Sequence, residues 1–236
     1  MHVGRARWLV WFGATFVFQA ALALDVVITR HAETLANVTG VYSSFNQRHF
    51  SETGLRQIDE LTAALGDRRF DAILVSPAHR CIKSIQPYLE RVGAQAEIWP
   101  ELDECCWIPE GRTEKTPPPE PILLEPEQRS LFVLRANAGE ATPGSESYVD
   151  GVKRVRAAVN LLLERYKGRD ATILVMTHHH TGGRLAEALL GESLVGRYKI
   201  KNATFTHLRE VEGRFRLIEL NRPTEPALAP VEQVSP

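Results

Sequence analysis

The sequence predicts an α/β fold in which strands and helices alternate along the chain. Short runs of β-branched and aliphatic residues, typical of buried strands, occupy residues 26–29, 70–75 and 171–177. Apolar residues recur at helical spacing between these runs, beginning with Leu55, Ile58, Leu61 and Leu65. Because such elements bury their apolar faces by packing helices against a sheet, we expect an α/β sandwich.

The helices are expected where a capping residue precedes an apolar pattern of helical period. Ser51 is placed to cap a helix that ends at Gly66, and Ser145 to cap a helix that ends near Gly168. In the helix that follows the second strand, Pro87 is expected to interrupt or kink the backbone, because proline lacks the N–H that a helix needs.

The remaining segments are shorter or less regular. A short strand is predicted at 96–99, and the last two strands at 203–208 and 215–220. Residues 109–143 are rich in proline and show no regular pattern, apart from a short helix expected between Glu125 and Arg135. This segment is interpreted as a lid or specificity insert, with a disordered loop as the alternative. Residues 221–236 are predicted to form a disordered tail.

Residues 1–23 differ in composition from the rest of the chain. Arg5 and Arg7 precede an almost wholly apolar run at 8–24, and residues 21–23 have the small-residue pattern of a signal-peptidase site. The segment is therefore predicted to be a signal peptide, with an uncleaved membrane anchor as the alternative. The uniformly apolar run disfavours a mitochondrial presequence. We expect a secreted, lumenal or periplasmic protein that contacts a membrane only through residues 8–24.

Charge and cysteine content narrow the function classes. The 236 residues suffice for one domain with appendages, and the net charge of -1 predicts no binding of nucleic acid. The three cysteines, Cys81, Cys105 and Cys106, allow at most one intramolecular disulfide and lack the spacing of a zinc site. Two alternatives remain. Either Cys81 forms a disulfide with Cys105 or Cys106, or all three cysteines are buried free thiols.

Polar residues follow three of the predicted strands. Arg30 and His31 follow the first, Ser76 follows the second, and His178 follows the strand at 171–177. In open α/β sheets the carboxyl ends of strands are where ligands bind, so we expect these residues to converge on one edge of the sheet.

The motifs around these residues are similar to those of a known family. Arg30-His31, Thr34 and Asn37 stand at the spacing of the Arg-His-Gly-x-Thr-x-x-Asn signature of the histidine phosphatase superfamily, with Ala32 in place of glycine. Leu102-x-Glu104 resembles a second motif of the branch related to phosphoglycerate mutase. The resemblance extends roughly over 26–220 and implies a three-layer sandwich, with a mixed, mostly parallel sheet and helices on both faces.

The resemblance also implies a role for each candidate residue. His31 is the expected nucleophile, since a neutral imidazole attacks phosphorus when its other nitrogen donates a hydrogen bond. Glu104 is the expected general acid and base, which requires a pKa raised by burial. The expected substrate-binding residues are Arg30, Asn37, Arg80 and His178, the two arginines because guanidinium holds phosphoryl oxygens bidentately.

Three functions remain open at this stage. A phosphomonoester hydrolase that forms phosphohistidine is the leading interpretation, and phosphoglycerate-type mutase and non-catalytic phosphate-binding module are the alternatives. Neither a cofactor nor a metal is expected, although the run His178-His179-His180 offers a metal site as a competing hypothesis. The substrate is expected to be a phosphorylated small molecule or a phosphoprotein, and the sequence indicates no oligomeric state.

Overall fold

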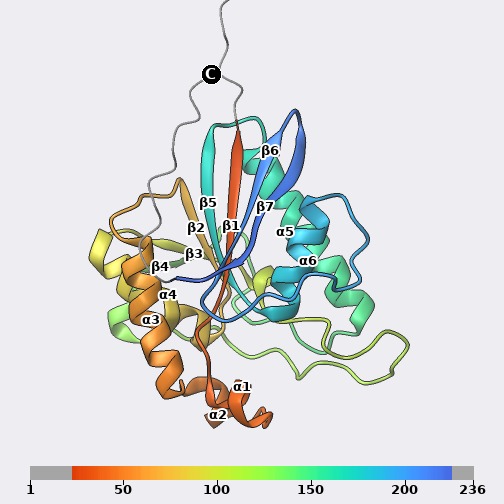
Figure 1. Cartoon of the computed structure of the whole chain (residues 1–236). Helices are drawn as coiled ribbons and strands as arrows, with labels where there is room; N and C mark the ends of the chain where they lie inside the picture. Colours follow the sequence, from red (N-terminus) through yellow and green to blue (C-terminus); the bar gives the residue numbers. More distant parts are fainter. Residues whose placement is uncertain (1–22, 225–236) are drawn as a thin grey trace, which may run out of the picture.

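A seven-stranded sheet with helices on both faces forms the centre of the protein (Figure 1). The structure is a computed structural model that describes residues 23–224. In chain order the elements are β1 (Leu24–Arg30), α1 (Leu35–Thr39), α2 (Ser44–Arg48), α3 (Glu52–Leu65), β2 (Ala72–Val75), α4 (His79–Val92), β3 (Ala96–Ile98), β4 (Phe132–Leu134), α5 (Tyr148–Tyr166), β5 (Ala171–Thr177), α6 (His179–Leu189), β6 (Phe205–Val211) and β7 (Arg214–Arg222), with short 3-10 helices at Pro100–Leu102 and Pro126–Gln128.

The order of the strands across the sheet is β4-β3-β2-β5-β1-β6-β7. The five strands from β4 to β1 are parallel, and β6 and β7 are antiparallel to their neighbours. The predicted fold class, a mixed and mostly parallel sheet in an α/β sandwich, is therefore confirmed.

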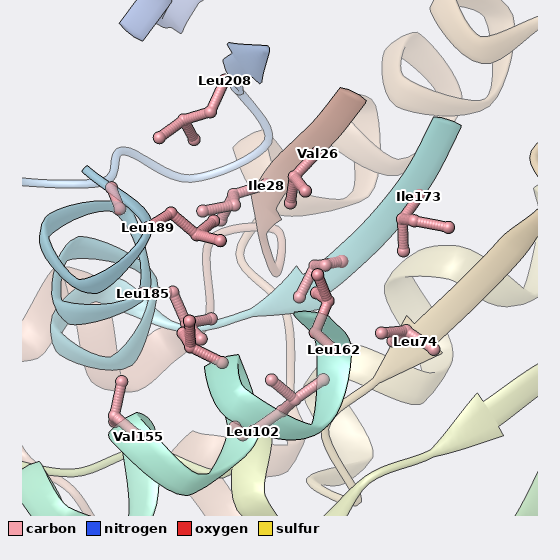
Figure 2. Close-up of a cluster of buried hydrophobic side chains, with 14 of the residues drawn as sticks. Val26, Ile28, Leu74, Leu102, Val155, Leu162, Ile173, Leu185, Leu189 and Leu208 are labelled. Carbon is pink, nitrogen blue, oxygen red and sulfur yellow. The ribbon is translucent and has the colours of Figure 1, made fainter. Parts of the chain in front are cut away.

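The two faces of the sheet bury separate apolar clusters because successive side chains of a strand point to opposite sides. On β5, Ile173 and Val175 join the cluster under α5 and α6, whereas Leu174 and Met176 join the cluster under α3 and α4. Figure 2 shows the first cluster, in which Leu162 of α5 lies on the helix side and Val26, Ile28 and Ile173 lie on the strands. The central strands are buried on both faces, and this explains why they form continuous apolar runs in the sequence.

Two helix predictions differ from the structure: α4 is not interrupted at Pro87, where a kink stays a prediction, and Ser145 is not the cap of α5. Helix α4 runs without interruption through Pro87, since Ile85, Tyr88 and Leu89 on either side of it are fully buried and their packing compensates for the missing hydrogen bond. Ser145 does not cap α5. It has a left-handed backbone with φ of 55°, and Ser147 is the capping residue, whose hydroxyl accepts the N–H of Asp150.

The proline-rich segment also differs from expectation. A helix was predicted between Glu125 and Arg135, but only a 3-10 turn forms there, and the chain then enters β4. Phe132 of β4 is buried, and β4 extends the sheet by pairing in parallel with β3. β4 lies within the segment for which the sequence predicted a helix.

The terminal predictions fall mostly outside the described residues. Residues 1–22 of the proposed signal peptide or anchor lie outside the described residues, and so do residues 225–236 of the proposed tail. β7 extends to Arg222, two residues past the expected end of the domain. Within residues 23–224, no helix has the length and apolar character needed to cross a membrane.

Candidate active site

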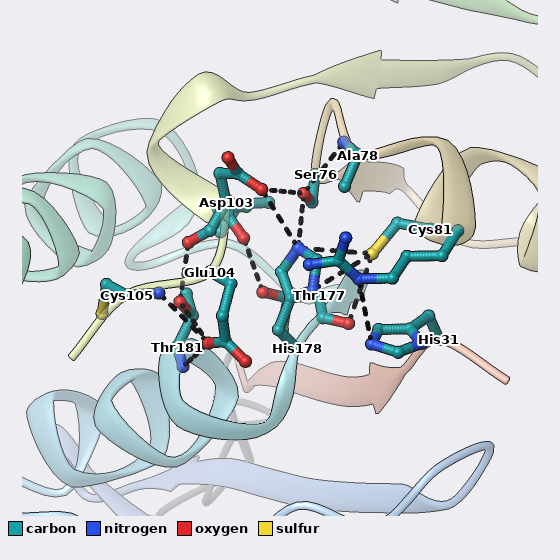
Figure 3. Close-up of polar contacts among 12 residues, drawn as sticks. His31, Ser76, Ala78, Cys81, Asp103, Glu104, Cys105, Thr177, His178 and Thr181 are labelled. Carbon is teal, nitrogen blue, oxygen red and sulfur yellow. Dashed lines mark hydrogen bonds and ion pairs between the residues drawn. The ribbon is translucent and has the colours of Figure 1, made fainter. Parts of the chain in front are cut away.

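Histidine and arginine side chains meet where neighbouring strands end. β1 ends at Arg30 and leads into His31, while the adjacent strand β5 leads into His178. Arg80 comes from the first turn of α4, which follows β2. The rings of His31 and His178 lie 5.3 Å apart between centroids, and Nε of Arg80 donates to Nε2 of His31 at 3.3 Å (Figure 3).

His31 is held as a neutral imidazole with a defined orientation. Its Nδ1 lies 2.8 Å from the carbonyl oxygen of Ala32, so Nδ1 carries the proton and Nε2 keeps its lone pair. Burial, followed by the positive charge of Arg80, holds the pKa of His31 well below its ordinary value of 6.5. Ala32 is itself fixed, because its N–H donates to Oγ of Ser84 at 2.9 Å.

The two arginines lie on either side of His31 and retain donors for a ligand. Nη1 of Arg30 donates to the carbonyl oxygen of Ile200 at 3.3 Å, but its Nε is buried without a hydrogen-bond partner. Nη1 of Arg80 donates to the amide oxygen of Gln47 at 3.2 Å, which ties α2 to the site. This arrangement is suited to holding the oxygens of a phosphoryl group.

His178 is fully buried and contacts both a hydroxyl and a carboxylate. Its Nε2 lies 2.7 Å from Oγ of Ser76 and 3.3 Å from Oδ1 of Asp103. Burial and the charge of Arg80 lower its pKa, although Asp103 and Glu104 oppose this effect. The role of His178 in binding a phosphoryl group remains a prediction.

Glu104 lies at the N-terminus of α6, where it accepts several hydrogen bonds. The backbone N–H groups of Thr181 and His180 donate to Oε1 at 3.0 Å and 3.2 Å. Burial alone would raise the pKa of Glu104, but His178, His180 and these N–H groups outweigh it, so the pKa lies below its ordinary value. Glu104 would therefore act as a general acid only where a bound ligand offsets these effects.

Asn37 is linked to the backbone of His31 through Asn202, and its amide oxygen already accepts hydrogen bonds. Its Oδ1 accepts the N–H of Thr34 at 3.1 Å at the start of α1, and Nδ2 of Asn202 donates to it at 3.3 Å. Asn202 also donates to the carbonyl oxygen of His31 at 2.8 Å. In this structure Asn37 supports the backbone of the site, and its role in substrate binding remains a prediction.

Sequence reasoning left out two side chains that contact the site. Asp103 stands next to Glu104 in the sequence, and its carboxylate also accepts from Oγ of Ser76 at 3.3 Å (Figure 3). Burial would raise the pKa of Asp103, but hydrogen bonding to His178 brings it below its ordinary value. The adjacent acidic pair was the available signal for Asp103, and Gln47 gave no signal at all.

The cysteines pair differently from the bridge considered from the sequence. Cys105 and Cys106 are bonded to each other, and Cys81 is a buried free thiol. Cys81 donates to the carbonyl oxygen of Thr177 at 3.4 Å and lies 3.6 Å from Nε2 of His178. Cys81 therefore packs against His178 inside the protein.

The histidine run is divided among different contacts. Nδ1 of His179 lies 2.9 Å from the carbonyl oxygen of Ile200, and the ring of His180 packs edge-on against that of His179. Among residues 23–224, no group of three or more His, Cys, Asp or Glu side chains is arranged to hold a metal ion.

A cavity of about 260 Å³ opens beside these residues. Arg80, Asp103 and Glu104 line it, together with Arg48 and His79. The proline-rich segment supplies a further wall, formed by Thr116, Pro117, Pro118, Glu120, Thr142 and Pro143. A small ligand in this cavity would therefore contact Arg80 and Glu104, and the segment at 109–143 borders the cavity.

Comparison with known proteins identifies the family. A model of the histidine phosphatase superfamily (branch 1) matches residues 26–223. The chain belongs to this superfamily. The uncharacterized protein Rv0525 of Mycobacterium tuberculosis is 30% identical over 172 residues, which make up 72% of this chain and 80% of that protein. The adenosylcobalamin/α-ribazole phosphatase of Salmonella typhimurium is 35% identical over 77 residues, or 33% of this chain and 38% of that enzyme.

Solved structures of this histidine phosphatase fold are similar over most of the chain. The α-ribazole phosphatase from Shigella flexneri has a TM-score of 0.61 and 21% identity, covering 84% of this chain and 96% of that one. Mycobacterial glucosyl-3-phosphoglycerate phosphatase has a TM-score of 0.59 and 23% identity, covering 85% and 99%. At this identity the similarity establishes the fold, and these neighbours are phosphatases.

Proposed function

We propose that this histidine phosphatase family member hydrolyses phosphomonoesters through a phosphohistidine intermediate on His31. The observation that carries the proposal is the state of this imidazole. It is buried and neutral, its Nδ1 bonded to the carbonyl oxygen of Ala32 and its Nε2 directed at the guanidinium of Arg80. A fixed tautomer with a free lone pair beside cations is what nucleophilic attack on phosphorus requires.

In the first step, Nε2 of His31 attacks phosphorus, a P–N bond forms, and the bond to the ester oxygen breaks. Arg30 and Arg80 hold the non-bridging oxygens and stabilise the charge that develops on them. A bound phosphoryl group takes over the donor that Arg80 directs at Nε2 in the free protein. His178 supports the same oxygens from the adjacent strand end.

Glu104 supplies the proton that the departing oxygen needs. In the free protein it is a carboxylate, so it must first take up a proton. The negative charge of a bound phosphoryl group favours this uptake, because a like charge raises the pKa of a carboxyl group. After the alcohol leaves, the carboxylate accepts a proton from water, which attacks phosphorus and releases inorganic phosphate and neutral His31.

Steady-state hydrolysis of p-nitrophenyl phosphate tests the proposal, with His31→Ala and His207→Gln compared with the unmodified chain. His207 lies on β6 and pairs with Asp25 at the opposite end of β1, so its variant controls for the loss of a histidine. We expect turnover in the parent and in His207→Gln, and none in His31→Ala. Brief reaction with radiolabelled substrate should leave label that is stable to alkali and lost in acid, as expected of phosphohistidine.

Two results would contradict the proposal. Turnover that survives in His31→Ala excludes this nucleophile, and turnover abolished by EDTA would redirect attention to metal chemistry. If folded protein releases no phosphate, a coupled assay for transfer between the hydroxyl groups of phosphoglycerate tests the mutase alternative, and calorimetry with phosphate tests binding alone.

We also infer that residues 1–23 direct the protein into an export route, on the basis of their charge and apolar pattern. N-terminal sequencing of the mature protein from its own source should find Leu24 as the first residue. Recovery of an intact N-terminus in the membrane fraction would support the anchor instead.

A further inference from the structure

A disulfide joins the two residues that directly follow the proposed general acid, Glu104. Cys105 and Cys106 are neighbours in the sequence, and their sulfur atoms are bonded to each other. The bond closes a small ring that includes the peptide between the two cysteines, so their backbones cannot turn independently. Cys105 is fully buried and Cys106 is 7% exposed. The disulfide takes no part in the proposed reaction.

The backbone of this ring is hydrogen-bonded to the carboxylate of Glu104. The N–H of Cys105 donates to Oε1 of Glu104 at 3.1 Å (Figure 3). The N–H of Thr181, at the start of α6, donates to the same oxygen at 3.0 Å. The position of this carboxylate oxygen therefore depends on the disulfide ring as well as on α6.

Cys106 has a backbone conformation that few residues other than glycine adopt. Its φ is 63°, which lies in the left-handed region. A residue with a Cβ stays in this region only where the surrounding structure enforces it, and the ring closed with Cys105 supplies that constraint. Without the bond, Cys106 is free to take up a commoner backbone conformation, which would redirect the chain between Glu104 and Trp107.

Helix α5 leaves no space behind the disulfide. A Cβ at Gly151 would lie 3.0 Å from Cβ of Cys105 and 3.1 Å from Sγ of Cys106. When the bond breaks, the two sulfur atoms must move apart, and in a close-packed interior this separation requires movement of the backbone. Because Cys105 is enclosed, the movement falls on Cys106 and Trp107. Trp107 is 42% exposed and lines the cavity together with Glu104.

We propose that the Cys105–Cys106 disulfide is a positioning element for Glu104, and that its reduction by a dithiol slows proton transfer to the leaving group. This inference rests on the proposed function, because it assigns a regulator to the same site. In the oxidised form the N–H of Cys105 is held against the carboxylate. In the reduced form this hydrogen bond is lost, and substrates whose leaving oxygen needs a proton are affected most.

The reduction is a thiol–disulfide exchange. A thiolate of the dithiol attacks Sγ of Cys106, the bond between the cysteines breaks, and Sγ of Cys105 leaves as a thiolate that takes up a proton. The second thiol of the reductant then attacks the mixed disulfide, so Cys106 is released as a thiol and the reductant becomes a disulfide. Since disulfides persist in oxidising compartments, an exported protein would keep the bond until it meets such a reductant.

Turnover of two substrates by the oxidised and the reduced full chain tests the inference. Dithiothreitol is the reductant, and mass spectrometry of the alkylated chain confirms that Cys105 and Cys106 have become thiols. Glycerol phosphate releases an oxygen that needs a proton, whereas p-nitrophenolate leaves without one. Reduction should lower kcat for glycerol phosphate about tenfold, the contribution of one hydrogen bond to a charged group, and reoxidation should restore it.

The release of p-nitrophenolate should change much less on reduction. A loss of the same size with both substrates would show general damage to the site and would overturn the positioning role. An unchanged kcat for glycerol phosphate in the fully reduced chain would overturn it as well.

Two variants separate the disulfide from other effects of the reductant. Cys106→Ser cannot form the bond, so its ratio of the two kcat values should equal that of the reduced parent, with or without dithiothreitol. Cys81→Ser removes the free thiol and, whatever its basal rate, should keep the parent's response to reduction. A response that persists in Cys106→Ser or disappears in Cys81→Ser would overturn the inference. Reduction and reoxidation of the parent decide the question even where Cys106→Ser does not fold.

Hydrogen exchange followed by NMR separates this inference from the proposed function, because it needs no turnover. The N–H groups of Cys105 and Thr181, which donate to Glu104, should exchange faster after reduction. The N–H of Thr172, which donates to Asp71 near the other end of β5, is the control and should not change. Equal exchange of Cys105 and Thr181 in both forms would overturn the positioning role even in an active enzyme. Faster exchange in a protein that hydrolyses no phosphomonoester would support positioning while contradicting the proposed function.

Discussion

Arg154 and Glu146 form a two-bonded ion pair next to the segment that carries Asp103 and Glu104. Nε and Nη2 of Arg154 each lie 2.7 Å from one carboxylate oxygen of Glu146. Nη1 donates to the carbonyl oxygens of Glu101 and Asp103 at 2.8 Å and 3.0 Å, and Nη2 reaches that of Glu104 at 3.3 Å. The guanidinium of Arg154 therefore connects α5 with Glu146, which follows the proline-rich segment, and with the backbone of Asp103 and Glu104.

Replacing Arg154 should damage both stability and turnover. Arg154→Gln leaves Glu146 and several carbonyl oxygens without their donor, and breaking a largely buried ion pair in this way costs about 3–5 kcal/mol. Urea denaturation measures this loss. In the molecules that remain folded, we expect a lower kcat with little change in KM, because Arg154 contacts the backbone of Asp103 and Glu104 and has no hydrogen bond to Arg30 or Arg80.

Arg154→Lys distinguishes geometry from charge. A single ammonium group cannot reproduce five directed hydrogen bonds, so it should recover only part of the stability and little of the kcat. Arg165→Lys is a suitable control. Arg165 also lies on α5 and also pairs with a glutamate, but that glutamate is Glu97 of β3. Full recovery of kcat by Arg154→Lys would contradict a positioning role.

The strands that the sequence predicted most directly are those that are buried on both sides. β1, β2 and β5 were recognisable because they are continuous apolar runs, and their order in the sheet places Arg30, His31 and His178 together. β4 was missed because its pairing with β3 depends on the sheet edge and not on a local pattern. The helix continues through Pro87 for a similar reason, since local propensity gives way to tertiary packing.

In the candidate site, too, local sequence motifs predicted which residues take part, but not the contacts that distant segments make with them. The positions of Arg80 and Glu104 followed from motifs, but the protonation state of Glu104 depends on N–H groups from α6, almost eighty residues later in the chain. Arg154 gave no signal because it acts through carbonyl oxygens, which every residue has. Contacts with the backbone of distant segments cannot be inferred from side-chain identity.

Glu104→Gln should affect substrates according to their leaving group. Alkyl phosphates release a basic oxygen that needs a proton, so the kcat for glycerol phosphate should fall about a hundredfold or more. p-Nitrophenolate leaves without a proton, and its release should change little. Glu110→Gln, an exposed neighbour, serves as the control. Equal losses with both substrates would show that Glu104 acts by some means other than proton transfer.

Gly54→Ala should disturb the loop that follows His31. A Cβ at Gly54 would lie 1.9 Å from the carbonyl oxygen of Glu33, and backbone at this point cannot move aside as a flexible side chain can. We expect a loss of about 1–3 kcal/mol in the free energy of unfolding, with reduced turnover. Gly139→Ala is the matched control, because nothing lies within 4 Å of its Cβ position. Unaltered stability of Gly54→Ala would contradict the close approach.

Stability should fall on mild acidification because the buried histidines are neutral. The pKa values of His31 and His178 lie below 6.5 in the folded protein, so the unfolded chain binds more protons as the pH drops through that value. Their contribution is fully present above the unfolded pKa and is lost below it, by up to about 1.4 kcal/mol per pH unit for each histidine. Denaturation curves between about pH 7.5 and 5.5 measure the slope. Replacing His178 by Asn should make it shallower, and a flat profile in the parent protein would mean that these histidines are not held neutral.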